Sequence, residues 1–158
     1  MKAVLPPPHQ NSRETILVLD FGSQYSRLIA RRVRESRVYC EIISHDTTWD
    51  SVSGLGVKGI ILSGGPASVD DLDAPLAPSW VYEKNIPVLG ICYGMQVLAY
   101  LSVSGQVHPA TTREFGLAEI DLSSQSIQTS NSLFADLPNC FDVWMSHGDR
   151  IDQLPDGF

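Results

Sequence analysis

A short run of sequence, IPVLGICYGMQVLAYL at residues 86–101, carries most of the information about the fold. Residues 86–91 are mostly apolar, which is typical of a strand buried in a parallel sheet. Residues 95–101 are also mostly apolar and predict a helix after this strand. Two glycines, Gly90 and Gly94, frame the junction in the order G-x-C-x-G. The pattern therefore predicts a strand that turns sharply into a helix, with Cys92 at the turn.

Cys92 is the residue of this run with the most distinctive chemistry. A sharp strand-to-helix turn strains the backbone of its central residue, and flanking glycines avoid clashes. The turn exposes the sulfur at a helix N-terminus, where backbone N–H groups favour the thiolate. We therefore interpret Cys92 as a nucleophile, with the Tyr93 N–H placed to help bind an oxyanion. For Cys40 and Cys140, which have no glycine frame, a small buried hydrophobe is the better interpretation.

The rest of the chain favours an α/β domain whose central sheet is mostly parallel and flanked by helices. Parallel sheets place ligands at the carboxyl ends of their strands, so the loops Phe21–Ser23, Gly64–Pro66 and Cys92–Gly94 are candidate functional loops. Further strands are expected at residues 15–20, 38–44 and 57–62, further helices at 23–36 and 76–84, and shorter strands at 118–122 and 141–146.

The pair Gly64-Gly65 follows the strand expected at residues 57–62. Glycine lets the backbone approach a reacting carbonyl closely, so this pair can supply a second oxyanion donor. A plain turn before Pro66 explains the same residues about equally well.

Composition narrows the classes of function. The 158 residues fit one domain, and 18 acidic against 11 basic residues leave a net charge of −7, which argues against a nucleic-acid partner. No apolar run approaches the ~20 residues that cross a membrane, and no signal peptide is visible, so a cytoplasmic protein is expected.

Three widely spaced cysteines predict neither a disulfide framework nor a zinc site, and no metal site is expected. Residues 1–13 are expected to form a flexible tail before a domain at residues 14–158.

Several motifs together resemble a known family. The GGP of residues 64–66 and the GICYGMQ of residues 90–96 are similar to the class I, triad-type glutamine amidotransferases. DFGSQY at residues 20–25 and MSHGD at residues 145–149 narrow the resemblance to one branch. In that branch, the amidotransferase releases ammonia from glutamine. The ammonia passes to an ATP-dependent synthetase domain that aminates adenylated XMP to GMP. The resemblance covers nearly all of residues 15–158 and implies a flavodoxin-like fold.

The resemblance also implies a role for individual residues. Cys92 would attack the side-chain amide of L-glutamine, and the backbone N–H groups of Gly65 and Tyr93 would hold the oxyanion. The residues implied to bind glutamine are Gly64, Gln96, Ser146, His147 and Gly148. No cofactor is expected in this chain, because ATP and Mg would belong to the synthetase (ATP pyrophosphatase) domain, which is the implied partner. Homo-oligomers are a further possibility, and no membrane partner is expected.

A cysteine nucleophile of this type needs a histidine base and an acid that orients it. In the family these residues come from an F-H-P-E segment, which this sequence lacks, as it lacks the SGGVDS loop of the synthetase. None of the four histidines of the sequence fits the role of this base. His9 lies in the tail, and His45 is expected to make a local hydrogen bond. His108 matches a structural turn of the family, and His147 lies in the segment implied to bind glutamine. We therefore expect a truncated amidotransferase domain that turns over little or no glutamine by itself.

Two other functions compete with this interpretation. An amidotransferase-like fold without catalysis could act as a binding or regulatory module, with an exposed sheet edge to favour association. The stripe Arg27, Arg31 and Arg34 could then be a docking face, although a solvated helix face is the simpler explanation. A cysteine hydrolase of another class would keep Cys92 as the nucleophile but leaves DFGSQY and MSHGD unexplained.

Overall fold

The computed structural model describes residues 13–102, 106–122 and 134–153, which fall into two units. The first unit comprises residues 1–108 and 151–158, and the second comprises residues 109–150. The tail expected at residues 1–13 lies, except for Arg13, outside the described residues, and so do residues 154–158. The first unit contains β1 (Glu14–Asp20), α1 (Ser26–Glu35), β2 (Cys40–Ser44), α2 (Trp49–Val52), β3 (Gly56–Leu62), α3 (Trp80–Glu83), β4 (Val88–Gly90) and α4 (Tyr93–Leu101).

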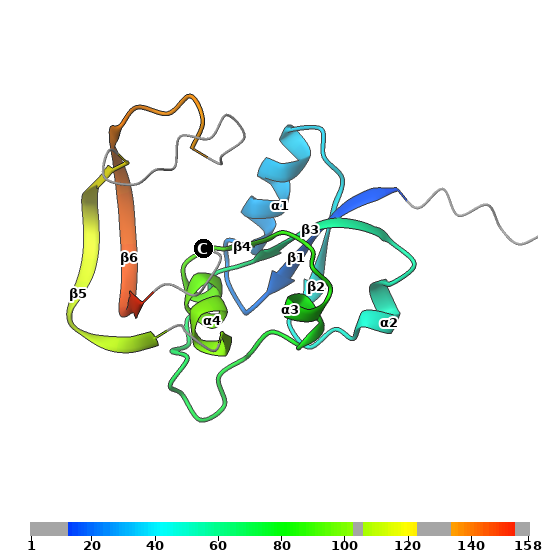
Figure 1. The fold of residues 1–158 in the computed structure, drawn as a ribbon, viewed down its shortest axis with the longest axis horizontal. Coiled ribbons are helices and arrows are strands. Elements are labelled where there is room, and N and C mark those ends of the chain that lie inside the picture. Colours follow the sequence, from blue (N-terminus) through cyan, green and yellow to red (C-terminus); the bar gives the residue numbers. More distant parts are fainter. Residues whose placement is uncertain (1–12, 103–105, 123–133, 154–158) are drawn as a thin grey trace, which may run out of the picture. The chain divides into compact units, whose positions relative to one another are not determined.

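The four strands of the first unit form one parallel sheet in the order β2-β1-β3-β4 (Figure 1). β1 pairs with β2 from Ile16 opposite Cys40 to Asp20 opposite Ser44. On its other side β1 pairs with β3, and β3 pairs with β4 through Leu62 opposite Gly90. The strand order reverses direction at β1, which places a crevice at the carboxyl ends of β1 and β3. The prediction of a parallel α/β sheet is confirmed.

Helices cover both faces of this sheet. Successive side chains of β1 are buried alternately on one face and on the other. Leu17 and Leu19 of β1 pack with α3 and α4 in the larger core, around Trp80, Val97 and Leu98. Val18 points to the opposite face, where it packs with Ala30 of α1 and with Cys40. In Figure 1, α1 lies on one side of the strands and α3 and α4 lie on the other. Successive side chains of a strand point to opposite faces, so both faces of β1 are buried.

Most predicted elements of the first unit are confirmed, although several begin or end at other residues than expected and one short helix was not predicted. The helix expected at residues 23–36 begins only at Ser26, because Gly22–Tyr25 form a loop instead. The helix expected at residues 76–84 is reduced to α3, since Pro78 steers the preceding residue away from helical geometry. The short helix α2 was not predicted; its four residues are too few for a periodic pattern.

The second unit is built on two long strands that form a separate two-stranded sheet. β5 runs over Gln106–Asp121 and β6 over Cys140–Gln153, with the Leu122 N–H donating to the Asn139 carbonyl at 2.7 Å. The strands expected at residues 118–122 and 141–146 lie within or at the end of these two strands, which are both much longer than predicted.

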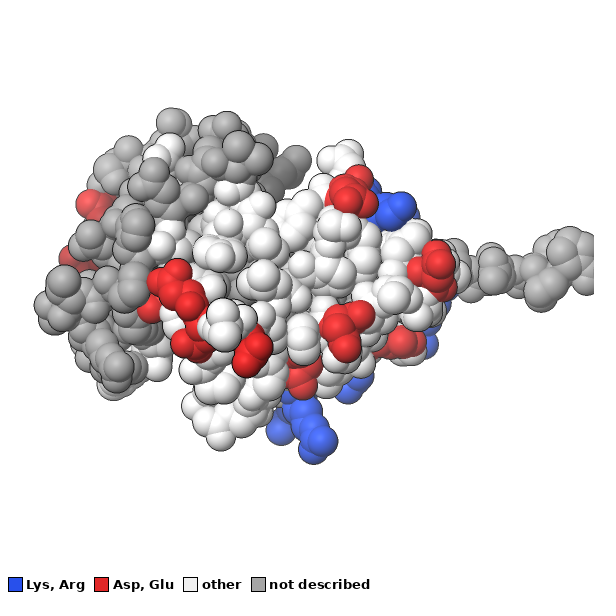
Figure 2. Space-filling model, turned by 90° about the horizontal axis from the view of Figure 1, so that it is seen from below, with Lys and Arg blue, Asp and Glu red and all other residues white. Residues whose placement is uncertain are grey.

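Three of the four arginines of α1 make contacts within their own helix or with β2. Arg31 and Arg32 pair with Glu35 at 2.9 Å and 2.8 Å, and these hydrogen bonds, that of Arg32 foremost, lower the pKa of Glu35. Arg34 donates to the Cys40 carbonyl at 3.1 Å. These contacts favour a solvated helix face over a docking surface. Among the charged side chains on the face seen in Figure 2, most are acidic, and the few basic ones lie toward its margin.

Two absences hold for the part of the chain that the structure describes. Each of its helices falls short of the length and apolar character that a membrane-spanning helix requires. It also contains no group of three or more histidine, cysteine or acidic side chains that could hold a metal ion.

Leu19 provides a test of the core. Its side chain is fully buried between β1 and the α4 side of the sheet, so Leu19→Ala leaves a cavity there. We expect this substitution to lower the free energy of unfolding by about 2–5 kcal/mol. The matched control is Leu72→Ala, since Leu72 is 100% exposed and its loss should change stability by no more than about 0.5 kcal/mol. Urea denaturation measures both, and equal effects would contradict the assigned core.

Candidate active site

The turn between β4 and α4 holds Cys92 in a strained backbone conformation. Cys92 has φ 53° and ψ −115°, a combination that residues other than glycine rarely adopt. It stands at the N-cap of α4, and its side chain is exposed. The predicted G-x-C-x-G turn is therefore present with its expected geometry. Strain of this kind persists only where the surrounding structure enforces it.

Both glycines of the turn are required by close backbone contacts. A Cβ on Gly90 would lie 2.6 Å from the Met95 Cα, inside the first turn of the helix. A Cβ on Gly94 would lie 2.3 Å from the Leu62 carbonyl oxygen, at the end of β3. Neither distance can be accommodated without a shift of the backbone. The glycines thus allow α4 to begin directly against β3, and the steric need predicted for them is confirmed.

Backbone hydrogen bonds fix the turn to the neighbouring strand. The Ile91 N–H donates to the Leu62 carbonyl at 3.0 Å, and the Gly94 N–H donates to the Ser63 carbonyl at 3.0 Å. Inside the turn, the Cys92 carbonyl accepts from the N–H groups of Met95 and Gln96. Cys92 is therefore held between a strand end and a helix start, with little freedom to relax its φ.

Ser63 and the two glycines after it form the second loop of the site. The Ser63 hydroxyl is fully buried; it accepts from the Phe21 N–H at 3.2 Å and donates to the Gly64 carbonyl at 2.9 Å. A Cβ on Gly64 would lie 3.6 Å from the Cys92 Cβ, so this loop runs beside the nucleophile. A Cβ on Gly65 would lie 2.9 Å from the Phe21 carbonyl oxygen, so Gly65 has no room for a side chain.

The loop between β1 and α1 forms the third part of the site. Asp20 ends β1, and its Oδ1 accepts from the N–H groups of Gly22 and Ser23 and from the Ser26 hydroxyl. The Ser23 hydroxyl in turn accepts from the Tyr25 N–H at 3.0 Å. One carboxylate thus organises the entire loop, which explains why the helix starts at Ser26.

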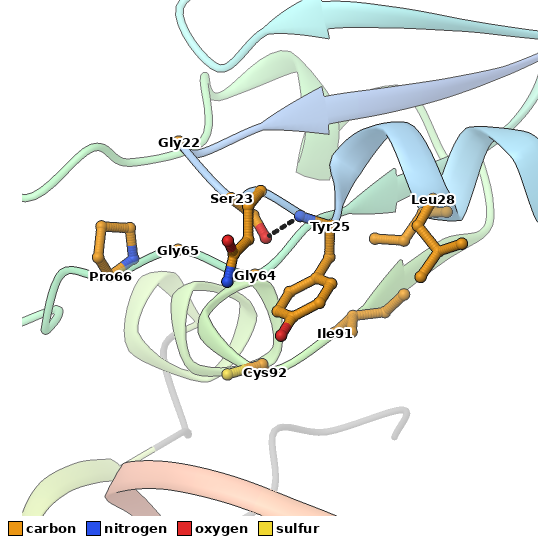
Figure 3. Close-up of a pocket in the computed structure, with 11 residues that line it drawn as sticks. Gly22, Ser23, Tyr25, Leu28, Gly64, Gly65, Pro66, Ile91 and Cys92 are labelled. Carbon is orange, nitrogen blue, oxygen red and sulfur yellow. Dashed lines mark hydrogen bonds between the residues drawn. The ribbon is translucent and has the colours of Figure 1, made fainter.

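These three loops surround a pocket of about 430 Å³ (Figure 3). Cys92 lies on its wall together with Ser23, Gly64 and Gly65. Its apolar side is contributed by Tyr25, Leu28, Ile29, Pro66 and Ile91. Parallel strands bring their carboxyl ends to one edge of the sheet, which is why residues 22–29, 64–66 and 91–92 converge.

The structure brings together some of the predicted site residues. Cys92, Gly64 and Gly65 line the pocket, and the backbone of Tyr93 lies next to Cys92, while its side chain is buried and donates to the Pro75 carbonyl at 3.0 Å. Gln96 is only 4% exposed and is not among the pocket's lining residues. Its glutamine-binding role stays a prediction.

The remaining predicted residues, Ser146, His147 and Gly148, lie in β6 within the second unit. Ser146 is exposed there. Their role in binding glutamine also stays a prediction. Conversely, no individual role was predicted for Ser23, Tyr25 or Ile91, which line the pocket. The only signal for them was their position in or beside the candidate loops at the strand ends.

The other two cysteines differ from Cys92 in their surroundings. Cys40 is buried and donates its S–H to the Ala30 carbonyl at 3.3 Å. The Cys140 side chain is exposed, and it is not the small buried hydrophobe that was expected. Partial desolvation and the carboxylates of Asp121 and Glu119 raise the pKa of the Cys140 thiol. Neither residue has the strained backbone of Cys92.

Comparison with known proteins gives consistent matches. The profile of the "Glutamine amidotransferase class-I" family matches residues 17–158. The chain is 55% identical over 151 residues to a GMP synthase [glutamine-hydrolyzing] of Thermomicrobium roseum and 54% identical over 146 residues to that of Dehalococcoides mccartyi strain CBDB1. These matches cover 96% and 92% of the chain but only 28% and 26% of the two relatives.

Solved structures share the fold. A Thermoplasma acidophilum protein described as a subunit of GMP synthase superposes with a TM-score of 0.74 and 32% identity, covering 91% of this chain and 69% of that one. A glutamine amidotransferase of Thermotoga maritima superposes with a TM-score of 0.60 and 20% identity, covering 92% and 64% of the two chains. The second likeness concerns the fold alone.

The glycine contacts predict different effects of two alanine substitutions. Gly94→Ala must displace either β3 or α4, so it should cost about 3 kcal/mol or more of stability. Gly64→Ala meets only ordinary van der Waals contacts of 3.6 Å or longer, so its stability should stay within about 1 kcal/mol of the native chain. Circular dichroism during thermal unfolding measures the stability of both variants. A Gly94→Ala variant as stable as the native chain would contradict the assigned packing.

The thiol of Cys140 gives a prediction on pH. A raised pKa keeps the thiol protonated at neutral pH, and the thiolate is the reactive form. Alkylation of Cys140 should therefore be slower at pH 7.5 than that of an unstructured cysteine peptide, and its rate should level off at a higher pH than that of the peptide. Asp121→Asn removes one of the two carboxylates and should speed the reaction at pH 7.5, whereas Asp136→Asn should not. Mass spectrometry of the labelled peptide measures each rate, and an unchanged rate in Asp121→Asn would contradict the cause.

Proposed function

This chain belongs to the class I glutamine amidotransferase family, and we propose that it acts on the side-chain amide of L-glutamine with Cys92 as the nucleophile. The Cys92 sulfur attacks the amide carbon and forms a tetrahedral intermediate with a negatively charged oxygen. The C–N bond then breaks, the nitrogen takes up a proton and leaves as ammonia, and a glutamyl thioester remains on Cys92. Attack by water on the thioester releases glutamate and restores the thiol.

The observation that carries this proposal is the strained backbone of Cys92 beside an open pocket. Cys92 has a φ of 53° at a strand-to-helix turn, and the surrounding backbone leaves no room for a side chain at either glycine of this turn. A strained residue at such a turn is typical of nucleophiles in α/β enzymes. The side chain is exposed and lines the pocket, so a small substrate can reach the sulfur.

We assign the oxyanion of the intermediate to the backbone N–H groups of Gly65 and Tyr93. Tyr93 directly follows the nucleophile, at the start of α4. Gly65 belongs to the loop that runs beside Cys92, and its lack of a side chain lets that loop pack against Phe21 and Tyr93. Two donors from rigid backbone need no rearrangement as the charge develops, which is what lowers the barrier.

We further propose that this chain supplies ammonia for the reaction that the names of its relatives describe. Two of them, each a GMP synthase [glutamine-hydrolyzing], share more than half of the aligned residues with this chain. The ammonia would then aminate adenylated XMP to GMP on an ATP-dependent synthetase domain. The chain spans about a quarter of the length of these relatives, so ATP and Mg would be bound outside its 158 residues.

The proton transfers need a base that none of the four histidines of this sequence matches. We therefore propose that these 158 residues supply the nucleophile and part of the glutamine pocket, and that a histidine and a glutamate elsewhere in the enzyme activate Cys92. A nucleophile without its base can still react slowly with an activated substrate analogue, but it does not turn over efficiently.

The test uses 6-diazo-5-oxo-L-norleucine, an electrophilic analogue of glutamine, on the 158-residue chain. We expect one covalent adduct at Cys92 by peptide mass spectrometry, no adduct in Cys92→Ser, and unchanged labelling in Cys140→Ser. Ammonia release from L-glutamine should stay at the level of the Cys92→Ser variant. Labelling that favours Cys140 would contradict the assigned nucleophile. Sustained glutamine turnover would contradict the need for an external base.

A further inference from the structure

The Ser23 hydroxyl stands on the pocket wall with hydrogen-bonding capacity to spare. It accepts one hydrogen bond, from the Tyr25 N–H at 3.0 Å, and this bond is drawn in Figure 3. Among the residues that the structure describes, no acceptor takes the Ser23 O–H proton. A hydroxyl has one donor and two lone pairs, so Ser23 retains one donor and one acceptor site for a ligand.

Ser23 and Cys92 lie on either side of the same small gap. The position that a Cβ on Gly64 would occupy is 3.6 Å from the Ser23 Oγ and 3.6 Å from the Cys92 Cβ. Because Gly64 has no side chain, that space is left open between the hydroxyl and the nucleophile. A group that reacts with Cys92 therefore comes within reach of the Ser23 hydroxyl.

The hydroxyl is also held in place before any ligand arrives. The Asp20 Oδ1 accepts from the Ser23 N–H at 3.2 Å and from the Gly22 N–H at 2.9 Å. The Ser23 carbonyl accepts from the Ser26 N–H at 3.3 Å, which ties the loop to the first turn of α1. A donor that is already oriented loses little conformational entropy on binding.

We propose that Ser23 is a substrate-binding residue that hydrogen-bonds the reacting carboxamide of glutamine and selects it over a carboxylate. This inference rests on the proposed function. A carboxamide presents both an N–H donor and a carbonyl acceptor, and so matches the donor and the lone pair that Ser23 retains. A carboxylate presents acceptors only, so it leaves the lone pair of Ser23 unused. Tyr25 and Ile91 form an apolar wall that suits the methylene groups of the substrate.

The experiment measures how well L-glutamine and L-glutamate protect Cys92 in the 158-residue chain. The probe is methyl methanethiosulfonate, a small thiol reagent without an amide group, and peptide mass spectrometry follows modification of Cys92. The variants are Ser23→Ala, which removes the hydroxyl, and Ser23→Thr, which keeps it. Ser36→Ala is the matched control, since Ser36 lies at the far end of α1 and its hydroxyl donates to the Arg32 carbonyl.

In the native chain we expect glutamine to protect Cys92 at lower concentration than glutamate. Ser23→Ala should weaken protection by glutamine about three- to tenfold more than protection by glutamate, because both ligands lose the Ser23 O–H donor but only the carboxamide also loses a hydrogen bond to the Ser23 lone pair. Ser23→Thr should restore the preference for glutamine, and Ser36→Ala should retain it. The rate of Cys92 modification without ligand is measured for each of the four proteins, and protection is expressed relative to that rate.

Two results would overturn the inference while leaving the proposed function intact. One is an unchanged preference for glutamine in Ser23→Ala. The other is an equal loss of protection by both ligands, which would indicate a purely structural role for Ser23. A native chain in which glutamine gives no protection at all would overturn both the inference and the proposed function, so the two failures are distinguishable.

Discussion

Gly94 lies so close to the end of β3 that a single added carbon would stand 2.3 Å from the Leu62 carbonyl oxygen. This contact allows the first turn of α4 to begin beside β3, with the Gly94 N–H bonded to the Ser63 carbonyl. Because both ends of the turn are attached to β3, Cys92 between them cannot relax its positive φ. The strain at the nucleophile is therefore a consequence of packing, maintained by the sheet beneath it.

Ser63 extends the same constraint from β3 to β1. Its buried hydroxyl accepts from the Phe21 N–H, and its N–H donates to the Leu19 carbonyl at 3.0 Å. Phe21 in turn packs against the buried ring of Tyr93, with the ring centroids 5.5 Å apart. The loops after β1, β3 and β4 are thus coupled through backbone and buried side chains. A pocket whose walls are joined in this way can hold its groups in place before a ligand binds.

Much of this arrangement could be predicted because it depends on local chemistry. The order of strands and helices follows from apolar runs and from loops rich in glycine and proline, and the G-x-C-x-G pattern has few structural solutions other than a sharp turn. Residues 76–84 show where such patterns fail, since Pro78 shortens the helix that their apolar content suggests. The helix expected from residue 23 likewise starts later, because the Asp20 carboxylate binds the N–H groups of Gly22 and Ser23.

The sequence by itself determined the class of fold, the identity of the nucleophile candidate and the family to which the chain belongs, because each depends on residue types at short, fixed spacing. Only the tertiary structure decided which side chains surround Cys92. Ser23 and Tyr25 come from one loop and Ile91 from a segment far along the chain, and they meet because parallel strands end at one edge of the sheet. Gln96, by contrast, is buried although it follows the nucleophile by only four residues. Burial depends on what packs against a helix, and that information is distributed over the whole chain.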